Sequence, residues 1–226
     1  METSRPGGRG VFAFEGRVNP SLAEQVRKAD PDRWLTSRFV ADEQARDDLV
    51  ALYAFEAELL TIPTRVTQPL LAEMRYAWWR EQMDGVFAGE PRKGHPVLEA
   101  LTDIAGRRGL ERAPFDALIE AHIGRVHGEP HDVEAFYVGP MQAAARVLGG
   151  AGLEADAAPA GRVWGLSQTG RFDEARAALA EASRAARRLP VAAFPAVLPA
   201  TLARSPEAGP LGKRLRLTWA AARGRL

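Results

Sequence analysis

The pattern of apolar and polar positions is helical from about residue 19 onward. Between residues 42 and 62, apolar side chains recur three or four positions apart, at Leu49, Leu52, Tyr53, Phe55, Leu59 and Leu60. The strict alternation of a half-buried strand is nearly absent, and β-branched residues are scarce. The pattern therefore predicts an all-α protein of about eight to eleven helices.

Proline and glycine mark the ends of these helices. The segments "NPSLAEQVRKAD" and "DPDRWLTSRFV" each begin with a capping residue followed by proline. The helix that starts near residue 42 is expected to stop at residues 62–63, because Pro63 cannot donate a backbone hydrogen bond. The next helix is expected to end at Gly89. The apolar residues expected on one face of that helix are Leu71, Met74, Trp78 and Phe87. Further helices are expected at residues 96–108, 113–126, 132–149, 156–169, 171–188, 191–204 and 210–223.

Residues 1–18 are rich in glycine and arginine, and we expect them to form a flexible tail before one helical domain at residues 19–226. Their "RPGGRG" element is too short to indicate nucleic-acid binding, so no nucleic-acid partner is expected. The N-terminus has no apolar run typical of a secretory signal, and no stretch approaches the roughly 20 apolar residues of a transmembrane segment.

Composition narrows the possible chemistry. The 30 basic residues nearly cancel the 29 acidic ones, so the net charge is +1. The chain has no cysteine, which excludes disulfides, thiolate zinc sites and cysteine nucleophiles. These features favour a cytoplasmic location.

Candidate metal and phosphate motifs do not have the required spacing. His122 and His127 are five residues apart, and Gly128 and Pro130 interrupt the interval between His127 and His131. The segment "GRVWGLSQTGRF" lacks both the preceding strand and the Gly-Lys-Ser/Thr ending of a Walker phosphate loop. No metal ligands are therefore expected among these residues.

Carboxylates at helical spacing also have a simple interpretation. Glu43 and Asp47 lie beside Arg46, and Glu81 and Asp84 follow Arg80. We expect these residues to form ion pairs on solvated helix faces. Glu56 and Glu58 are two residues apart, so their side chains should point in different directions.

Three stretches together resemble the squalene/phytoene synthase family. They are "DPDRWLTSRFVADEQARDDLVALYAFEAEL", "AEMRYAWWREQMDGVFAGEP" and the segment from "FDALIEAHIGRVHGEP" to "AGRVWGLSQTGR". The resemblance implies an isoprenoid-synthase-like bundle of α-helices around a central cavity, here truncated towards the C-terminus. It also implies an enzyme that condenses two prenyl diphosphates head to head, with Mg²⁺ held by two aspartate-rich motifs.

The resemblance transfers some site residues but not the first metal motif. It places Arg38, in "TSR", where the family has an arginine that contacts diphosphate, and Tyr53 where it has an active-site tyrosine. Where the family has aspartates after "ALYAF", this chain has Leu60 and Thr64, with Pro63 between them. Arg75 and Trp79 correspond to residues of the family's "R…WWRE" helix.

The second metal motif is also replaced. The family's Gln…Arg-Asp-x-x-x-Asp segment reads "GLSQTGRFDEAR" here, so Gln168 and Arg171 are kept while Phe172 and Arg176 fall near the aspartate positions. The segment that follows this motif in the family is missing. The resemblance thus leaves Arg38, Tyr53, Arg75, Trp79, Gln168 and Arg171 as relics of a diphosphate site, with no catalytic residue and no metal ligand.

The segment "AFEAEL" resembles a divergent branch of the family that includes a mitochondrial complex I assembly factor. We therefore expect a pseudoenzyme, a binding or assembly factor that needs no cofactor and has a protein partner, self-associates or binds an isoprenoid. The alternative is a Mg²⁺-dependent prenyltransferase of isoprenoid biosynthesis that uses displaced carboxylates such as Asp173 and Glu174. That alternative requires them to converge with Glu56 or Glu58.

Overall fold

A computed structural model describes residues 20–205 and 207–226. The expected tail at residues 1–18 and the capping Asn19 lie outside the described residues. Within them the chain forms eleven α-helices, one π-helix (η1), one 3₁₀-helix (η2) and no strand, which confirms the all-α prediction. The helices are α1 Pro20–Ala29, α2 Pro31–Ser37, α3 Glu43–Arg65, α4 Pro69–Ala88, α5 Pro96–Arg108, α6 Ala113–Val126, η1 Glu134–Val138, α7 Gly139–Gly149, α8 Glu154–Gln168, α9 Phe172–Ala186, α10 Phe194–Val197, η2 Leu198–Arg204 and α11 Pro210–Arg223.

Several helix ends follow from the predicted capping residues. The Asp30 carboxylate accepts a hydrogen bond from the backbone N–H of Arg33 at 2.9 Å, at the start of α2. Gly89 ends α4 in the left-handed conformation, with φ of 79°. The bounds predicted for α5 and α6 are those observed. The helix predicted at residues 191–204 is instead a short α10 followed by η2, in a segment where Pro195 and Pro199 remove backbone donors.

The prediction that α3 stops at residues 62–63 was wrong, because the helix continues through Pro63 to Arg65. Proline at this position removes the backbone N–H that would bond to the carbonyl of Leu59. The buried Tyr76 hydroxyl of α4 donates to that carbonyl instead, at 3.2 Å. A side chain from the neighbouring helix therefore compensates for the lost backbone bond.

The buried face of α4 also differs from the prediction. Leu71 and Met74 are exposed, at 42% and 61%, whereas Tyr76 and Trp79 are buried. The Trp79 ring packs edge-on against Phe55 of α3, with ring centroids 5.5 Å apart. The buried residues of α4 recur at helical spacing: Ala72, Tyr76, Trp79, Met83 and Val86.

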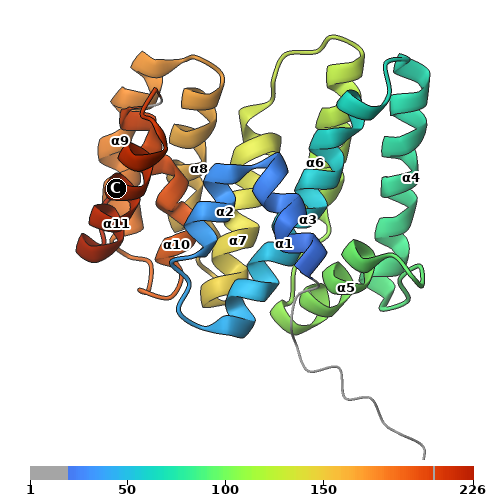
Figure 1. Cartoon of the computed structure of the whole chain (residues 1–226), viewed down its shortest axis with the longest axis horizontal. Helices are drawn as coiled ribbons and strands as arrows, with labels where there is room; N and C mark the ends of the chain where they lie inside the picture. The colour runs from blue at the N-terminus through green and yellow to red at the C-terminus, as the bar shows by residue number, and fades with distance from the viewer. Residues whose placement is uncertain (1–19, 206) are drawn as a thin grey trace, which may run out of the picture.

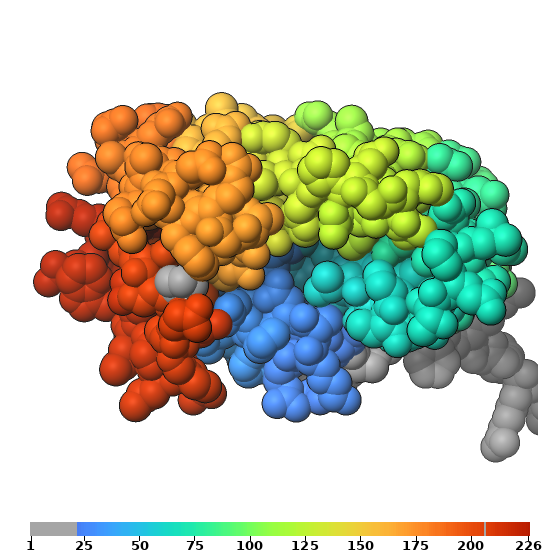
Figure 2. Space-filling view, turned by 90° about the horizontal axis from the view of Figure 1, so that it is seen from above, coloured from blue at the N-terminus to red at the C-terminus, as the bar shows by residue number. Residues whose placement is uncertain are grey.

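The helices pack around one core cluster whose members run from Leu22 in α1 to Leu226. Figure 1 shows α4 at one end of the molecule and α9 and α11 at the other. From above, the N-terminal helices in blue lie between the red C-terminal segment and the teal residues of α3 and α4 (Figure 2). Across residues 20–205 and 207–226, none of the helices combines the length and apolar character needed to cross a membrane.

Candidate ligand cavity

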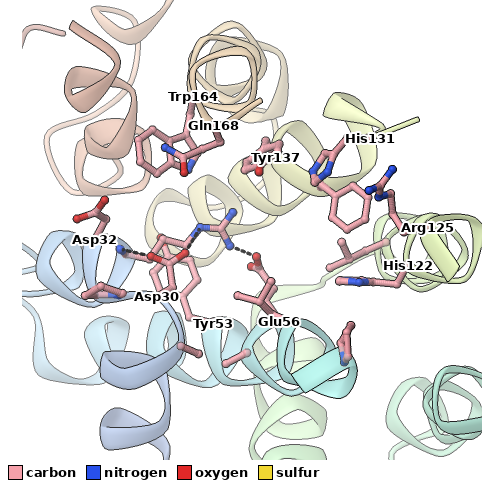
Figure 3. A pocket seen from close by; sticks show the side chains of 18 residues that line it. Asp30, Asp32, Tyr53, Glu56, His122, Arg125, His131, Tyr137, Trp164 and Gln168 are labelled. Carbon is pink, nitrogen blue, oxygen red and sulfur yellow. Dashed lines mark hydrogen bonds and ion pairs between the residues drawn. The ribbon is translucent and has the colours of Figure 1, made fainter. Parts of the chain in front are cut away.

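A cavity of about 540 Å³ lies among α2, α3, α6, η1 and α8. Figure 3 shows side chains from these elements pointing towards a common space. Its large apolar and aromatic lining residues are Tyr53, Leu60, Leu118, Phe136, Tyr137 and Trp164. The volume is within the range of about 300–1,000 Å³ that is usual for small-molecule sites.

A buried arginine occupies one wall of this cavity. Arg33 is only 6% exposed, and its guanidinium forms an ion pair with Glu56 of α3 (Figure 3). Its Nε atom also lies 3.6 Å from the Asp30 carboxylate, and its guanidinium lies over the Tyr53 ring at 5.3 Å from the centroid. A buried guanidinium needs negative charge close by, and Asp30 and Glu56 supply it. Both carboxylates are therefore engaged by Arg33.

The third carboxylate of the wall is also engaged. Asp32 accepts from the Lys213 ammonium of α11 at 2.7 and 2.9 Å. By contrast, one Glu56 oxygen, Oε1, is buried and has no hydrogen-bond partner within the described residues. An unsatisfied acceptor at a cavity wall is a place where a ligand or water can donate a hydrogen bond.

The opposite wall is largely aromatic, with Arg125 beside the two histidines. His122 stacks on Tyr76 with ring centroids 5.1 Å apart, and its Nδ1 lies 3.4 Å from the Tyr76 hydroxyl. Burial, reinforced by nearby His131, lowers the pKa of His122 to about 4, so the ring is neutral at neutral pH. Burial and the neighbouring Arg125 also lower the pKa of His131, against the opposing effect of Asp132.

The tyrosines of the cavity are neutral as well. Burial raises the pKa of Tyr53 to about 12 and raises the pKa of Tyr137. Neither phenol is therefore an effective base at neutral pH. The cavity has polar contacts, but none of these tyrosines or histidines carries a charge that could bind an anion.

The π-helix η1 positions Phe136 and Tyr137 in the cavity wall. The helix predicted at residues 132–149 is interrupted by this wider turn before α7 begins. Gly161 and Gly165 of α8 allow η1 to approach closely, since an added Cβ would lie 2.8 Å from the Val138 Cα and 2.7 Å from the Tyr137 ring. The glycines of "GRVWGLSQTGRF" therefore serve helix packing within α8.

The structure separates the six residues predicted as diphosphate-site relics. Tyr53 and Gln168 line the cavity. Arg75 and Trp79 line a second depression between α3 and α4. Arg38 is exposed at the C-cap of α2, and Arg171 is exposed and pairs with Glu174 at 2.6 Å. Neither of these two arginines lines the cavity.

Sequence reasoning missed the charged residues that do line it. Asp30 was identified only as a helix cap, Arg33 was not singled out, and Glu56 was considered only as half of an unsuitable metal pair. The available signal was local: Arg33 follows the capping Asp30 by one helical turn in "DPDRWL". Its pairing with Glu56 joins residues 23 positions apart, which the sequence pattern alone does not reveal.

The residues present do not fit the Mg²⁺ sites that the resemblance implies. Leu60 lines the cavity at the first aspartate position, and the Thr64 hydroxyl donates to the Thr61 carbonyl. Asp173 is 96% exposed on its side chain and pairs with Arg176 at 3.1 Å. Within the described residues, no group of three or more histidine, cysteine or acidic side chains is arranged to hold a metal.

The arrangement required by the prenyltransferase alternative is also not formed. Asp173 and Glu174 are paired with arginines on the surface of α9 and do not converge with Glu56. Glu58 points elsewhere and accepts from Gln25 at 2.5 Å, as its spacing from Glu56 predicted.

Other candidate groups form surface ion pairs, though not with the expected neighbours. Asp84 pairs with Arg112 at 2.6 Å, and Arg80 pairs with Glu120 at 2.6 Å. His127 pairs with Glu73 at 2.8 Å. These contacts join α4 to α6 or to the residues that cap α6. They therefore link two helices and do not form one site.

Comparison with known proteins agrees with the resemblance over part of the chain. The family model of squalene/phytoene synthase matches residues 26–137, just under half of the 226 residues. The matched region runs from α1 to η1 and contains Arg33, Tyr53 and Glu56. No curated protein and no solved structure matches the chain. The chain is thus similar to squalene/phytoene synthase over residues 26–137, and its all-α fold is consistent with an isoprenoid-synthase-like bundle.

Proposed function

We propose that this chain is a non-catalytic member of the squalene/phytoene synthase family, a binding or assembly factor whose cavity takes an uncharged isoprenoid. The observation that carries the proposal is that Leu60 lines the cavity at a metal-aspartate position, while the buried Arg33 engages the cavity's own carboxylates Asp30 and Glu56. The resemblance of "AFEAEL" to the divergent branch of the family supports the same function.

Electrostatics opposes magnesium at this wall. Mg²⁺ requires oxygen ligands in near-octahedral geometry and gives up its water reluctantly. A metal at Glu56 or Asp30 would either lie beside the positive charge of Arg33, which is 6% exposed, or displace its guanidinium and leave it buried without a counter-charge. Leaving a buried charge unpaired costs about 3–5 kcal/mol.

The charges of the lining favour an uncharged ligand over a diphosphate. Among the described residues, the cavity lining has three carboxylates, Asp30, Asp32 and Glu56, and two cations, Arg33 and Arg125. Arg33 is already neutralised, and Arg125 donates to the carbonyl of Glu129. A prenyl alcohol or hydrocarbon would contact the aromatic lining, and its hydroxyl could donate to the unsatisfied Glu56 oxygen.

Incubation with farnesyl or geranylgeranyl diphosphate and Mg²⁺ tests the non-catalytic part of the proposal. We expect diphosphate release no faster than in a protein-free blank. Release that requires the metal and is abolished by Glu56→Gln would establish the prenyltransferase alternative instead.

Binding of farnesol, measured by equilibrium dialysis, tests the ligand part. Tyr137→Ala should weaken binding about tenfold, because it removes aromatic contact area from the cavity wall. Met74→Ala, on the exposed face of α4, is the matched control and should bind like the wild type. Equal binding by both variants would place the ligand outside this cavity.

The assembly role requires a protein partner or a second copy, and the exposed side chains of α4 support it. Leu70, Leu71 and Met74 are 66%, 42% and 61% exposed, beside the depression that contains Trp78. We expect light scattering to give a mass above that of the 24.6 kDa chain, reduced by Met74→Glu. A wild-type monomer would rule out self-association through this face.

A further inference from the structure

Helix α11 has apolar side chains on two opposite faces. Leu217 and Ala220 are buried on the inner face, where α11 packs on η2. On the outer face, Leu211, Leu215 and Trp219 are 70%, 63% and 57% exposed. Their spacing of four residues places these three side chains in one stripe along the helix. Burial within the bundle accounts for the inner face but leaves the outer stripe unexplained.

Arginines flank this outer stripe. At about 100° per residue, Arg214 lies on one side of it and Arg223 on the other. The Arg223 guanidinium stacks on the Trp219 ring at 4.0 Å from the centroid. No acidic residue occurs in "PLGKRLRLTWAAAR". The stripe therefore has a positively charged rim, with Glu207 of the preceding segment as the nearest acidic residue along the chain.

The other two basic residues of α11 are directed to the protein. Lys213 forms its ion pair with Asp32 of α2, and Arg216 donates to the Ser205 hydroxyl at 2.9 Å. These contacts fix the rotation of the helix about its own axis. The same rotation leaves Leu211, Leu215 and Trp219 exposed. Helix α11 lies at the end of the molecule away from α4 (Figure 1).

A second copy of the chain is a poor match for this surface. In a symmetric dimer through the stripe, the arginine rims of the two copies would face each other, which is unfavourable. Three side chains also supply much less contact than the roughly 800 Å² per partner of a stable protein interface. A surface with negatively charged headgroups over an apolar interior matches both the apolar stripe and its basic rim.

We propose that α11 binds an anionic lipid bilayer surface, with its axis parallel to the membrane plane. Leu211, Leu215 and Trp219 insert below the headgroups, while Arg214 and Arg223 contact lipid phosphates. This is the residue distribution of interfacial helices, which have tryptophan and leucine on one face and a basic rim. The Arg223–Trp219 pair fits the interface, because the ring can be buried while the guanidinium remains at headgroup level.

Co-sedimentation with vesicles tests the proposal on the full chain. The wild type should bind vesicles that contain phosphatidylglycerol, and it should bind pure phosphatidylcholine vesicles much more weakly. Leu215→Asp should weaken binding at least about tenfold, because it places a charge in the inserted stripe. Arg214→Gln with Arg223→Gln should lower binding to the anionic vesicles about 25-fold, at about fivefold for each basic residue.

Val191→Asp is the matched control, because Val191 is an exposed apolar residue, at 90%, in the segment between α9 and α10 and outside both α11 and the α4 face. It should bind vesicles like the wild type. All the substituted side chains are exposed, so their melting temperatures should stay close to that of the wild type. The melting temperatures therefore separate a binding defect from unfolding.

Three results would overturn the proposal. They are no binding to anionic vesicles, equal binding to neutral and anionic vesicles, and equal loss in Leu215→Asp and Val191→Asp. A vesicle-free dimer that Leu215→Asp converts to monomer would instead assign the stripe to a second copy. Because the proposal does not depend on what the cavity binds, the farnesol and diphosphate measurements can fail without affecting it.

Discussion

Two carboxylates of α3, Asp48 and Glu56, are both bound by arginine but differ in how completely they are satisfied. Asp48 is 1% exposed and accepts from Gln44, Arg107 and Arg108 at 2.7–3.1 Å. Glu56 pairs with Arg33, and its Oε1 atom has no partner within the described residues. The first group joins α3 to α5, whereas the second faces the cavity.

This difference indicates that the ion pairs of Asp48 serve the fold, whereas the ion pair of Glu56 lies at a cavity that can take a ligand. Where every oxygen is used, as at Asp48, the arrangement is complete without a ligand. Where a buried oxygen is left over, as at Glu56, the fold retains a polar position that its own residues do not fill. Substitutions should therefore affect stability at Asp48 and ligand binding at Glu56.

The largest effect on stability is expected for Asp48→Ala. It leaves Arg107 and Arg108 without their shared partner and should lower the free energy of unfolding by about 3 kcal/mol, the lower end for a broken buried pair, since both arginines reach solvent. Urea denaturation followed by circular dichroism measures this. A loss below about 1 kcal/mol would show that the pair is no stronger than a surface ion pair.

Protonation of His122 should lower the stability less than Asp48→Ala does and more than Glu56→Gln does. Its pKa of about 4 in the folded protein lies below the ordinary value of 6.5, so the unfolded chain takes up the proton first. Stability is therefore lost as the pH falls from about 6.5 towards 4, by about 2 kcal/mol between pH 7 and pH 5.

Denaturation of His122→Gln at both pH values checks this assignment. The variant should lose the part of the pH dependence that His122 supplies. His127→Gln changes an exposed histidine and should retain the wild-type dependence. An identical pH dependence in all three proteins would assign the titration to other groups.

The smallest effect on stability is expected for Glu56→Gln. The amide oxygen can still accept from Arg33, and the new N–H₂ group replaces an acceptor that had no partner. The free energy of unfolding should fall by no more than about 1 kcal/mol, because Asp30 still balances the charge of Arg33 after the substitution. Farnesol binding should weaken measurably. A large loss of stability with unchanged farnesol binding would show that Glu56, like Asp48, serves the fold rather than the ligand.

Local sequence signals predicted much of the fold. The capping Asp30, the terminal Gly89 and the bounds of α5 and α6 depend on residues within one helical turn, and they appear where expected. Continuation of α3 through Pro63 could not be predicted locally, because the bond that compensates for it comes from Tyr76 of α4. The same limit applies to the buried face of α4, which depends on the Trp79–Phe55 contact.

The candidate site was harder to predict than the fold. Tyr53 and Gln168 were found through the family resemblance, and both line the cavity. The resemblance also selected the exposed Arg38, five residues beyond the buried Arg33. Burial of Arg33 depends on Glu56 and on the ring of Tyr53, which only the packing of α2 on α3 brings together.

The account depends on Arg33, rather than a metal, occupying the carboxylates of the cavity. The most direct test is anomalous diffraction from crystals soaked with Mn²⁺ and farnesyl thiodiphosphate, a substrate analogue that resists cleavage. We predict no manganese peak within bonding distance of Asp30, Asp32 or Glu56, and an intact Arg33–Glu56 pair. A manganese ion bound by two of these carboxylates, with Arg33 displaced, would contradict the account.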